Sequence, residues 1–213
     1  MHDRLTMTEL PTDVHALVVM LHGGAEHGQR PVDHRSLALR RTRAMFRSIS
    51  PRLTDAGIGV ALLRFAVKGW NAGGGRVPSP VTDARLAVQD LHAEHPDLPI
   101  VLLGHSMGAR TAAWVADEPG VVGVVGLAPW VPADEPVGAL AGKHLVAAHG
   151  SRDRITSAKA SRVFVSRAAE VAEEARFVDM GARGHYMMAG ATAWNQVATT
   201  ESLGILERVS QDR

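Results

Sequence analysis

Short apolar runs alternate along the chain with longer stretches in which apolar residues recur at helical spacing. The pattern predicts strands at 16–21, 59–65, 100–103, 121–127, 145–148 and 176–180, and helices at 36–56, 82–94, 106–117, 157–174 and 189–209. Most of the short runs are apolar throughout, which is typical of strands buried on both faces of a parallel sheet. The alternation therefore predicts an α/β fold, a doubly wound and mostly parallel sheet of about six to seven strands.

Composition limits the classes of partner and the location. The 213 residues contain no repeat or linker, which predicts a single domain over 1–213. With 23 Lys+Arg against 22 Asp+Glu, no global charge favours nucleic acid or an anionic membrane. No apolar run is long enough to span a bilayer, and no signal-peptide core opens the sequence. The absence of cysteine excludes thiol chemistry and fits a reducing compartment, so we expect a cytoplasmic protein. The sequence does not indicate its oligomeric state.

A G-x-S-x-G pattern stands where a predicted strand gives way to a predicted helix, in Gly104-His105-Ser106-Met107-Gly108. In this context the serine occupies a strained turn that lifts its hydroxyl out of the sheet. The glycines are needed because a Cβ there would collide with the neighbouring strand and helix. Such a pattern arises by chance in about a tenth of chains of this composition, and the alternative is an N-cap serine. Ser106 is the candidate nucleophile.

The loop after the first predicted strand contains His22-Gly23-Gly24-Ala25. Acyl transfer at a serine needs two backbone N–H donors for the oxyanion, one after the nucleophile and one from this loop. Gly24 and Met107 are the expected donors. The alternative is a glycine turn that only ends the strand, and for His22 itself we expect a role in shaping the loop.

The loop after the strand at 145–148 contains a single carboxylate, Asp153, which is the expected acidic member of a triad. The arginines that flank it in the sequence would hold it ionised if they approach. The alternative is a surface aspartate paired with one of them. Asp134 and Asp179, on the preceding and following connections, are rival candidates.

His185 follows the last predicted strand on a glycine-bearing loop. From there it can act as general base towards Ser106 Oγ and then as general acid towards the leaving group. A lone loop histidine carries little weight, but the chain order Ser106, Asp153, His185 changes that. Four separate loops each supply one part of an acyl-transfer site, and their conjunction predicts a serine hydrolase.

The motifs resemble those of the α/β-hydrolase superfamily over nearly the whole chain: HGG at 22–24, GHSMG at 104–108, HGSRD at 149–153 and GH at 184–185. A closer likeness is to small, capless hydrolases of the dienelactone-hydrolase-like group, bacterial relatives of the testis-expressed and NSL-complex-subunit hydrolase-like domain. It is carried by LLRFAVKGWN at 62–71, GHSMGAR at 104–110, LAPWVP at 127–132 and AHGSRDRIT at 148–156.

The resemblance implies an α/β-hydrolase fold without a cap domain, with Ser106 as nucleophile, Asp153 as acid and His185 as base. Dienelactone hydrolases proper use a cysteine nucleophile, which this chain lacks, so their substrate is not carried over. Some eukaryotic relatives serve mainly as interaction domains. A non-catalytic scaffold therefore remains the alternative of a different class.

The interval between Ser106 and Asp153 already holds a helix and two strands, so only Pro129–Lys143 has room to form a short flap. We expect Trp130, Tyr186 and Trp70 to line an apolar acyl pocket. The alternative for each is packing between sheet and helices.

The remaining sequence patterns do not indicate a nucleic acid, metal or nucleotide ligand. Six arginines fall in one predicted helix or just before it, namely Arg35, Arg40, Arg41, Arg43, Arg47 and Arg52. Without interleaved aromatic residues they predict a solvated helix face rather than a nucleic-acid site. The histidine pairs lack metal-ligand spacing, and Gly73-Gly74-Gly75 matches no nucleotide motif. The sequence thus predicts a hydrolase of esters or thioesters of small to medium acyl groups, without metal or cofactor. Amide cleavage or perhydrolysis by the same triad is the remaining alternative.

Overall fold

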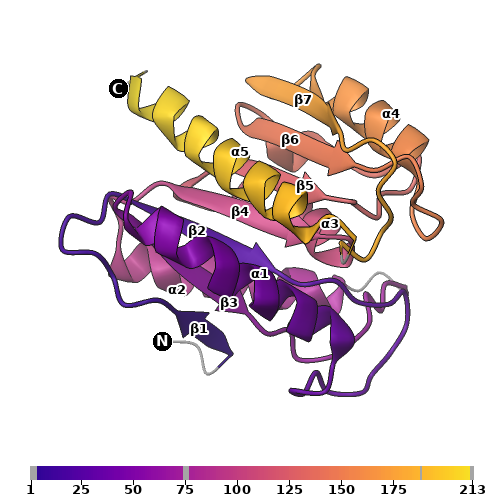
Figure 1. Cartoon of the computed structure of the whole chain (residues 1–213), viewed down its shortest axis with the longest axis horizontal. Helices are drawn as coiled ribbons and strands as arrows, with labels where there is room; N and C mark the ends of the chain where they lie inside the picture. Colours follow the sequence, from indigo (N-terminus) through magenta and orange to yellow (C-terminus); the bar gives the residue numbers. More distant parts are fainter. Residues whose placement is uncertain (1–3, 74–76, 188, 212–213) are drawn as a thin grey trace.

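The computed structural model describes residues 4–73, 77–187 and 189–211, which form one sheet with helices on both faces (Figure 1). In the described chain the sheet has seven strands in the order β1-β3-β2-β4-β5-β6-β7. Their bounds are β1 Leu5–Met7, β2 Ala16–Leu21, β3 Ile58–Leu63, β4 Ile100–His105, β5 Val121–Leu127, β6 His144–His149 and β7 Glu174–Asp179. All neighbouring strands pair in parallel except β1, which is antiparallel to β3. The predicted doubly wound, mostly parallel sheet is confirmed.

The helices are α1 Leu37–Thr54, α2 Ser79–Glu94, α3 Met107–Trp114, α4 Ala158–Ala168 and α5 Ala191–Gln211, with a short 3-10 turn η1 at Gly138–Leu140. Helices α1 and α5 pack together over one face of the sheet, α2 and α3 lie on the other, and α4 packs against β6 and β7 (Figure 1). Helix α2 begins three residues earlier than predicted, because Pro80 is tolerated in a first turn. In the ranges described, no helix combines the length and hydrophobicity needed to cross a membrane.

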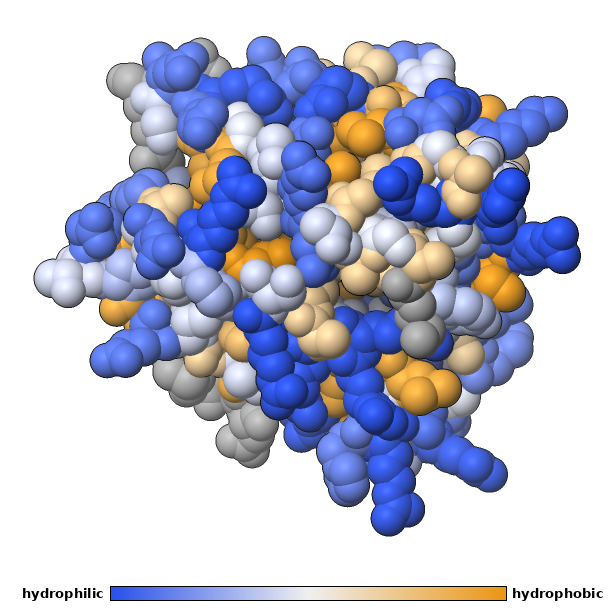
Figure 2. Space-filling model, in the orientation of Figure 1, coloured by the Kyte–Doolittle hydropathy of each residue, from blue (hydrophilic) through white to orange (hydrophobic). Residues whose placement is uncertain are grey.

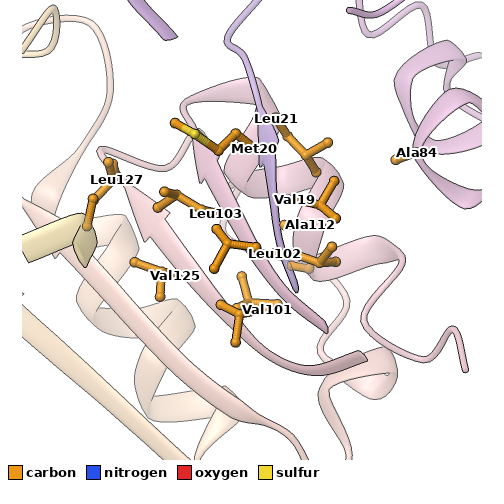
Figure 3. Close-up of a cluster of buried hydrophobic side chains, with 14 of the residues drawn as sticks. Val19, Met20, Leu21, Ala84, Val101, Leu102, Leu103, Ala112, Val125 and Leu127 are labelled. Carbon is orange, nitrogen blue, oxygen red and sulfur yellow. The ribbon is translucent and has the colours of Figure 1, made fainter. Parts of the chain in front are cut away.

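The central strands are buried along their whole length, as their continuous apolar runs predict. Every residue of β2, β3, β4 and β6 is buried. Figure 3 shows side chains from three adjacent strands, and Met20, Leu103 and Val125 lie in register on one face of the sheet. Strand β7 at the sheet edge is only half-buried, consistent with its mixed sequence EARFVD. The core therefore lies around β2, β4 and β5, with the motif-bearing loops at its border.

The parallel register brings the carboxyl ends of the strands to one edge of the sheet. Leu21 at the end of β2 lies beside Gly104 of β4, and Leu127 at the end of β5 lies beside His105. His149 at the end of β6 lies beside Asp179 of β7 in the same way. The loops that follow these strands therefore meet at one place, which is where open α/β sheets bind ligands.

The segment Pro129–Lys143, the expected site of any flap, is tied down at its centre by Glu135. This carboxylate is 1% exposed and pairs with Arg110 of α3 through two contacts of 2.7 Å. It also accepts a hydrogen bond from Trp114 Nε1. Arg167 of α4 donates to the Glu135 carbonyl at 2.9 Å. The segment is thus anchored to two helices.

We expect Glu135→Ala to lower the free energy of unfolding by about 3–5 kcal/mol, because it leaves the largely buried Arg110 guanidinium without its carboxylate. Urea unfolding followed by tryptophan fluorescence measures the loss. Asp134→Ala is the matched control, since the neighbouring carboxylate is exposed, and its effect should stay within about 0.5 kcal/mol. Equal losses in the two variants would contradict the anchoring role.

Candidate active site

Ser106 occupies the turn between β4 and α3 in a conformation that non-glycine residues seldom adopt, with φ 54° and ψ −115°. Its N–H donates to the Leu127 carbonyl at 3.0 Å, which ties the turn to β5. Its own carbonyl accepts from the N–H of Trp130 at 3.3 Å. The serine is therefore held from both sides in the strained turn that its motif predicts.

The two glycines of this turn are required by close backbone approach. A Cβ on Gly104 would lie 2.4 Å from the Gly108 carbonyl oxygen, and a Cβ on Gly108 would lie 2.1 Å from the Leu21 oxygen. No side chain fits either space. The predicted collisions with the following helix and with the neighbouring strand are both confirmed.

Asp153 and His185 form a hydrogen-bonded pair, with Asp153 Oδ2 2.8 Å from His185 Nδ1. Their side chains are 1% and 6% exposed. Burial by itself would raise the pKa of Asp153, but the N–H groups of Thr156 and Ile155, each 2.8 Å from Oδ1, and the bond from His185 outweigh it. The net result is a pKa below the usual value, so the carboxylate is ionised at neutral pH.

The rival acids do not reach His185. Asp179 is exposed and pairs with Arg162 at 2.8 Å, and Asp134 is exposed. Arg152 and Arg154 do not approach Asp153 in the way that would let them hold it ionised, because both are exposed and neither pairs with it among the described residues. Backbone N–H groups and histidines serve instead.

A second imidazole binds the same carboxylate oxygen. His149 Nε2 lies 3.0 Å from Asp153 Oδ2, and His149 Nδ1 lies 2.8 Å from the Ser161 hydroxyl. Burial lowers the pKa of His149 and keeps it neutral. An ionised carboxylate only accepts, so Nε2 carries the proton and Nδ1 accepts from Ser161. The sequence analysis gave His149 no role, and the only available signal was its position four residues before Asp153 at a strand end.

Thr156 completes the hydrogen bonding of this oxygen. Its hydroxyl donates to Asp153 Oδ2 at 2.8 Å and lies 3.1 Å from His185 Nδ1. Thr156 was not predicted either. Oδ2 therefore has three partners, which fix the carboxylate in the plane that orients His185.

Two further histidines of these loops are neutral and structural. His22 Nδ1 donates to the Gly23 carbonyl at 2.6 Å and Nε2 accepts from the Phe65 N–H at 3.1 Å, while burial lowers the pKa of His22 to about 4. The expectation that His22 shapes its loop is confirmed. His105 Nε2 donates to the His185 carbonyl at 3.0 Å, and burial lowers the pKa of His105 to about 3. His105 thereby holds the backbone of the candidate base beside the serine turn.

The two expected oxyanion donors lie against one another. A Cβ on Gly24 would be 2.3 Å from Met107 Cε, so the Gly24 backbone packs directly on the residue after the serine. Within the described chain, neither the Gly24 N–H nor the Met107 N–H donates to a protein acceptor. Both N–H groups are thus without a protein acceptor; Gly24 is exposed, whereas Met107 is fully buried.

A cleft of about 210 Å³ opens beside the serine. It is lined by Gly24, Ala25, Glu26, Ser106, Trp130, Ile155 and Thr156. His185 does not line the cleft, but its Nδ1 lies 3.1 Å from the hydroxyl of Thr156, which does. No hydrogen bond joins Ser106 Oγ to His185 Nε2 among the residues described; such contacts are often long in free enzymes.

The three expected pocket residues are placed differently. Trp130 lines the cleft. Trp70 is 2% exposed and packs edge-on behind Trp130, with ring centroids 6.1 Å apart, so it supports the cleft wall without forming it. Tyr186 is half-exposed and packs edge-on against His185, with centroids 5.5 Å apart, and lines a different pocket. Of the three, only Trp130 belongs to the cleft that contains Ser106.

The buried neutral histidines make stability depend on pH. Their folded pKa values lie below the unfolded value of about 6.5, so protons bind the unfolded state more tightly and stability falls as pH drops below that value. Between pH 7.5 and 5.5, His22 and His105 together should lower the free energy of unfolding by about 3 kcal/mol. Urea unfolding at the two pH values measures this change. An unchanged unfolding midpoint would contradict the neutral state of these side chains.

We compared the sequence and the fold with those of known proteins. The family model described as serine aminopeptidase, S33, matches residues 75–148, a stretch that contains Ser106 and ends before Asp153. No curated protein matches the chain. The fold resembles an alpha-beta serine hydrolase homologue from Coxiella burnetii, with 16% identity and a TM-score of 0.67 over 92% of this chain and 90% of that one.

Two further solved structures are similar. One is an α/β serine hydrolase without a lid from Xanthomonas campestris, with 17% identity and a TM-score of 0.65 over 92% of this chain and 86% of that one. The other is Est1E from Butyrivibrio proteoclasticus with ferulic acid bound, with 13% identity and a TM-score of 0.65 over 95% and 96%. The strand order, the serine turn and these likenesses show that the protein has the α/β-hydrolase fold, with no cap domain among its described residues.

Proposed function

We propose that the protein is a serine hydrolase that cleaves carboxylic esters or thioesters of small to medium acyl groups. Ser106 is the nucleophile, His185 the general base and acid, and Asp153 the acid that orients the imidazole. The observation that supports this most strongly is the buried Asp153–His185 pair, 2.8 Å apart, which Thr156 joins to the cleft that holds Ser106 in its strained turn.

The reaction begins with the substrate carbonyl in the cleft. Ser106 Oγ attacks the carbonyl carbon while its proton passes to His185 Nε2. The carbonyl oxygen becomes an oxyanion and accepts hydrogen bonds from the free N–H groups of Gly24 and Met107. Met107 is the first residue of α3, so the positive end of that helix also faces the developing charge.

Collapse of the tetrahedral intermediate breaks the carbon–oxygen or carbon–sulfur bond. His185 returns its proton to the departing alkoxide or thiolate, which leaves Ser106 acylated. Water then attacks the acyl-enzyme, again giving a proton to His185, and the carboxylic acid departs as serine regains its hydrogen. Throughout, ionised Asp153 accepts a hydrogen bond from Nδ1–H of His185 and stabilises the imidazolium.

The size and chemistry of the cleft support a modest acyl group. Its volume of about 210 Å³ is below that of most sites for drug-sized ligands, and Trp130 and Ile155 give it apolar walls. Because ferulic acid is bound in the Est1E structure, methyl ferulate belongs in the substrate panel. The serine aminopeptidase description of the matching family adds an amino-acid anilide, which tests for amide cleavage.

We expect Ser106→Ala to abolish both labelling by a fluorophosphonate and hydrolysis of p-nitrophenyl acetate and butyrate, with a loss of at least about 10³-fold in kcat. Ser151→Ala, an exposed serine on the neighbouring loop, is the control and should retain both. Turnover that survives in Ser106→Ala would disprove the assignment of the nucleophile. A folded wild-type protein that takes up no fluorophosphonate would support a non-catalytic scaffold instead.

His149→Leu removes a hydrogen-bond donor from Asp153 while keeping an apolar side chain of similar size. We expect kcat/KM to fall about tenfold, the free-energy equivalent of one hydrogen bond. A carboxylate that has lost a donor is more basic and stabilises the His185 imidazolium, so the acid limb of the pH–rate profile should move to higher pH. His149→Gln, which can still donate, should recover part of the rate. A lower rate with an unmoved acid limb would reduce His149 to a packing role.

A further inference from the structure

Helix α1 carries an arginine stripe, Arg40, Arg43 and Arg47, at positions i, i+3 and i+7, which face the same side of a helix. With His34 and Ala44 these residues line a hollow of about 330 Å³, named here the arginine hollow. Figure 2 views the molecule from the side of α1 and α5 and shows hydrophilic side chains gathered over the region of α1. The hollow is thus a concave and cationic surface.

No carboxylate neutralises this stripe. Helix α1 contains no acidic residue, and none of the three arginines forms an ion pair within the described parts of the chain. On α5, which packs against α1, Glu201 is committed to Arg176. Like charges at these spacings destabilise a helix by a few tenths of a kcal/mol per pair, so the stripe favours the bound state of an anion.

The arginine hollow connects to the candidate active site through Tyr186. The Arg41 guanidinium lies 4.3 Å from the centre of the Tyr186 ring, and that ring packs edge-on against His185. Arg41 and Tyr186 line a second pocket of about 300 Å³ with mostly apolar walls. Ala44 belongs both to this pocket and to the arginine hollow. The pocket at Tyr186 therefore lies between His185, which contacts the Tyr186 ring, and the arginine hollow, with which it shares Ala44.

The proposed reaction determines which half of the substrate lies on the side of Tyr186 and the arginine hollow. His185 must protonate the leaving group, so the alcohol or thiol half of the substrate lies on the His185 side. The acyl half occupies the cleft beside Trp130. The pocket at Tyr186 and the hollow beyond it consequently face the leaving group.

We propose that the arginine hollow binds phosphate carried by the alcohol or thiol half of the substrate, and that the apolar pocket at Tyr186 accommodates the arm between phosphate and ester. This inference rests on the proposed function. Guanidinium groups stay charged and bind phosphate oxygens in pairs. The sequence predicts that the arginine-bearing face of α1 is solvated. This face also adjoins the candidate active site.

Two thioesters with the same acyl group test the proposal. Butyryl-coenzyme A carries phosphates on its thiol half, and butyryl-pantetheine is the same thioester without them. We expect kcat/KM to favour the coenzyme A ester by about tenfold or more at low ionic strength, with the ratio shrinking in 0.5 M salt. The triple variant R40A/R43A/R47A should bring the ratio to about one. Arg52→Ala, in the last turn of the same helix, should keep it.

A second experiment measures ligand binding directly and does not depend on catalytic turnover. In the Ser106→Ala protein, calorimetry should show coenzyme A binding at least about tenfold more tightly than pantetheine, and R40A/R43A/R47A should remove the difference. Equal binding of the two ligands would overturn the proposal. Butyrate esters that end in a carboxylate and compete as well as coenzyme A would overturn the assignment to phosphate. Failure of fluorophosphonate labelling would instead count against the proposed hydrolase, so the two failures are distinguishable.

Discussion

The buried carboxylate of Asp153 is the constraint around which the site is built. A charge so far from water is tolerated only when its oxygens are fully hydrogen-bonded. Oδ1 binds two N–H groups of its own turn, and Oδ2 binds His149 at the end of β6, Thr156 of the same turn and His185 after β7. Because these partners come from one strand and two loops, satisfying one carboxylate fixes the relative position of the acid and base loops.

Neutral histidines form the frame of the same region. Each is buried, and each has its pKa lowered by that burial, so the frame carries no charge of its own at neutral pH. This matters most for His105, whose ring centroid is 4.9 Å from that of His185. In the proposed reaction His185 becomes an imidazolium, and a charged neighbour at that distance would oppose it. A neutral His105 instead donates a hydrogen bond to the His185 carbonyl. It adds no positive charge beside the imidazolium, which Asp153 stabilises.

The parts of this structure that are local in sequence were predictable. The apolar runs place β2 and β5 to the residue, because a strand buried on both faces must be apolar throughout. The glycine pattern around Ser106 predicts the serine turn for a steric reason that holds at both glycines. Strand β1 is too short to carry a pattern, and its pairing depends on β3 more than fifty residues away. His149, Thr156 and the burial of Trp70 likewise depend on contacts made only when distant loops meet.

Arg110 and the arginines of α1 differ in their contacts with carboxylates, and this difference determines what each side chain can bind. Arg110 lies over the rings of Trp70 and Trp130, at 4.2 and 4.7 Å from their centres, and is neutralised by buried Glu135. Its charge is fully used in holding the cleft wall. The arginines that line the hollow on α1 have the same side chain, yet no carboxylate faces the hollow among the described residues. A guanidinium that lacks an internal partner beside a reactive centre is left to bind an external one. In the proposed reaction the two sides of the site therefore differ: on the acyl side a buried Arg110–Glu135 pair supports Trp130, whereas the leaving-group side presents arginines that form no ion pair among the described residues.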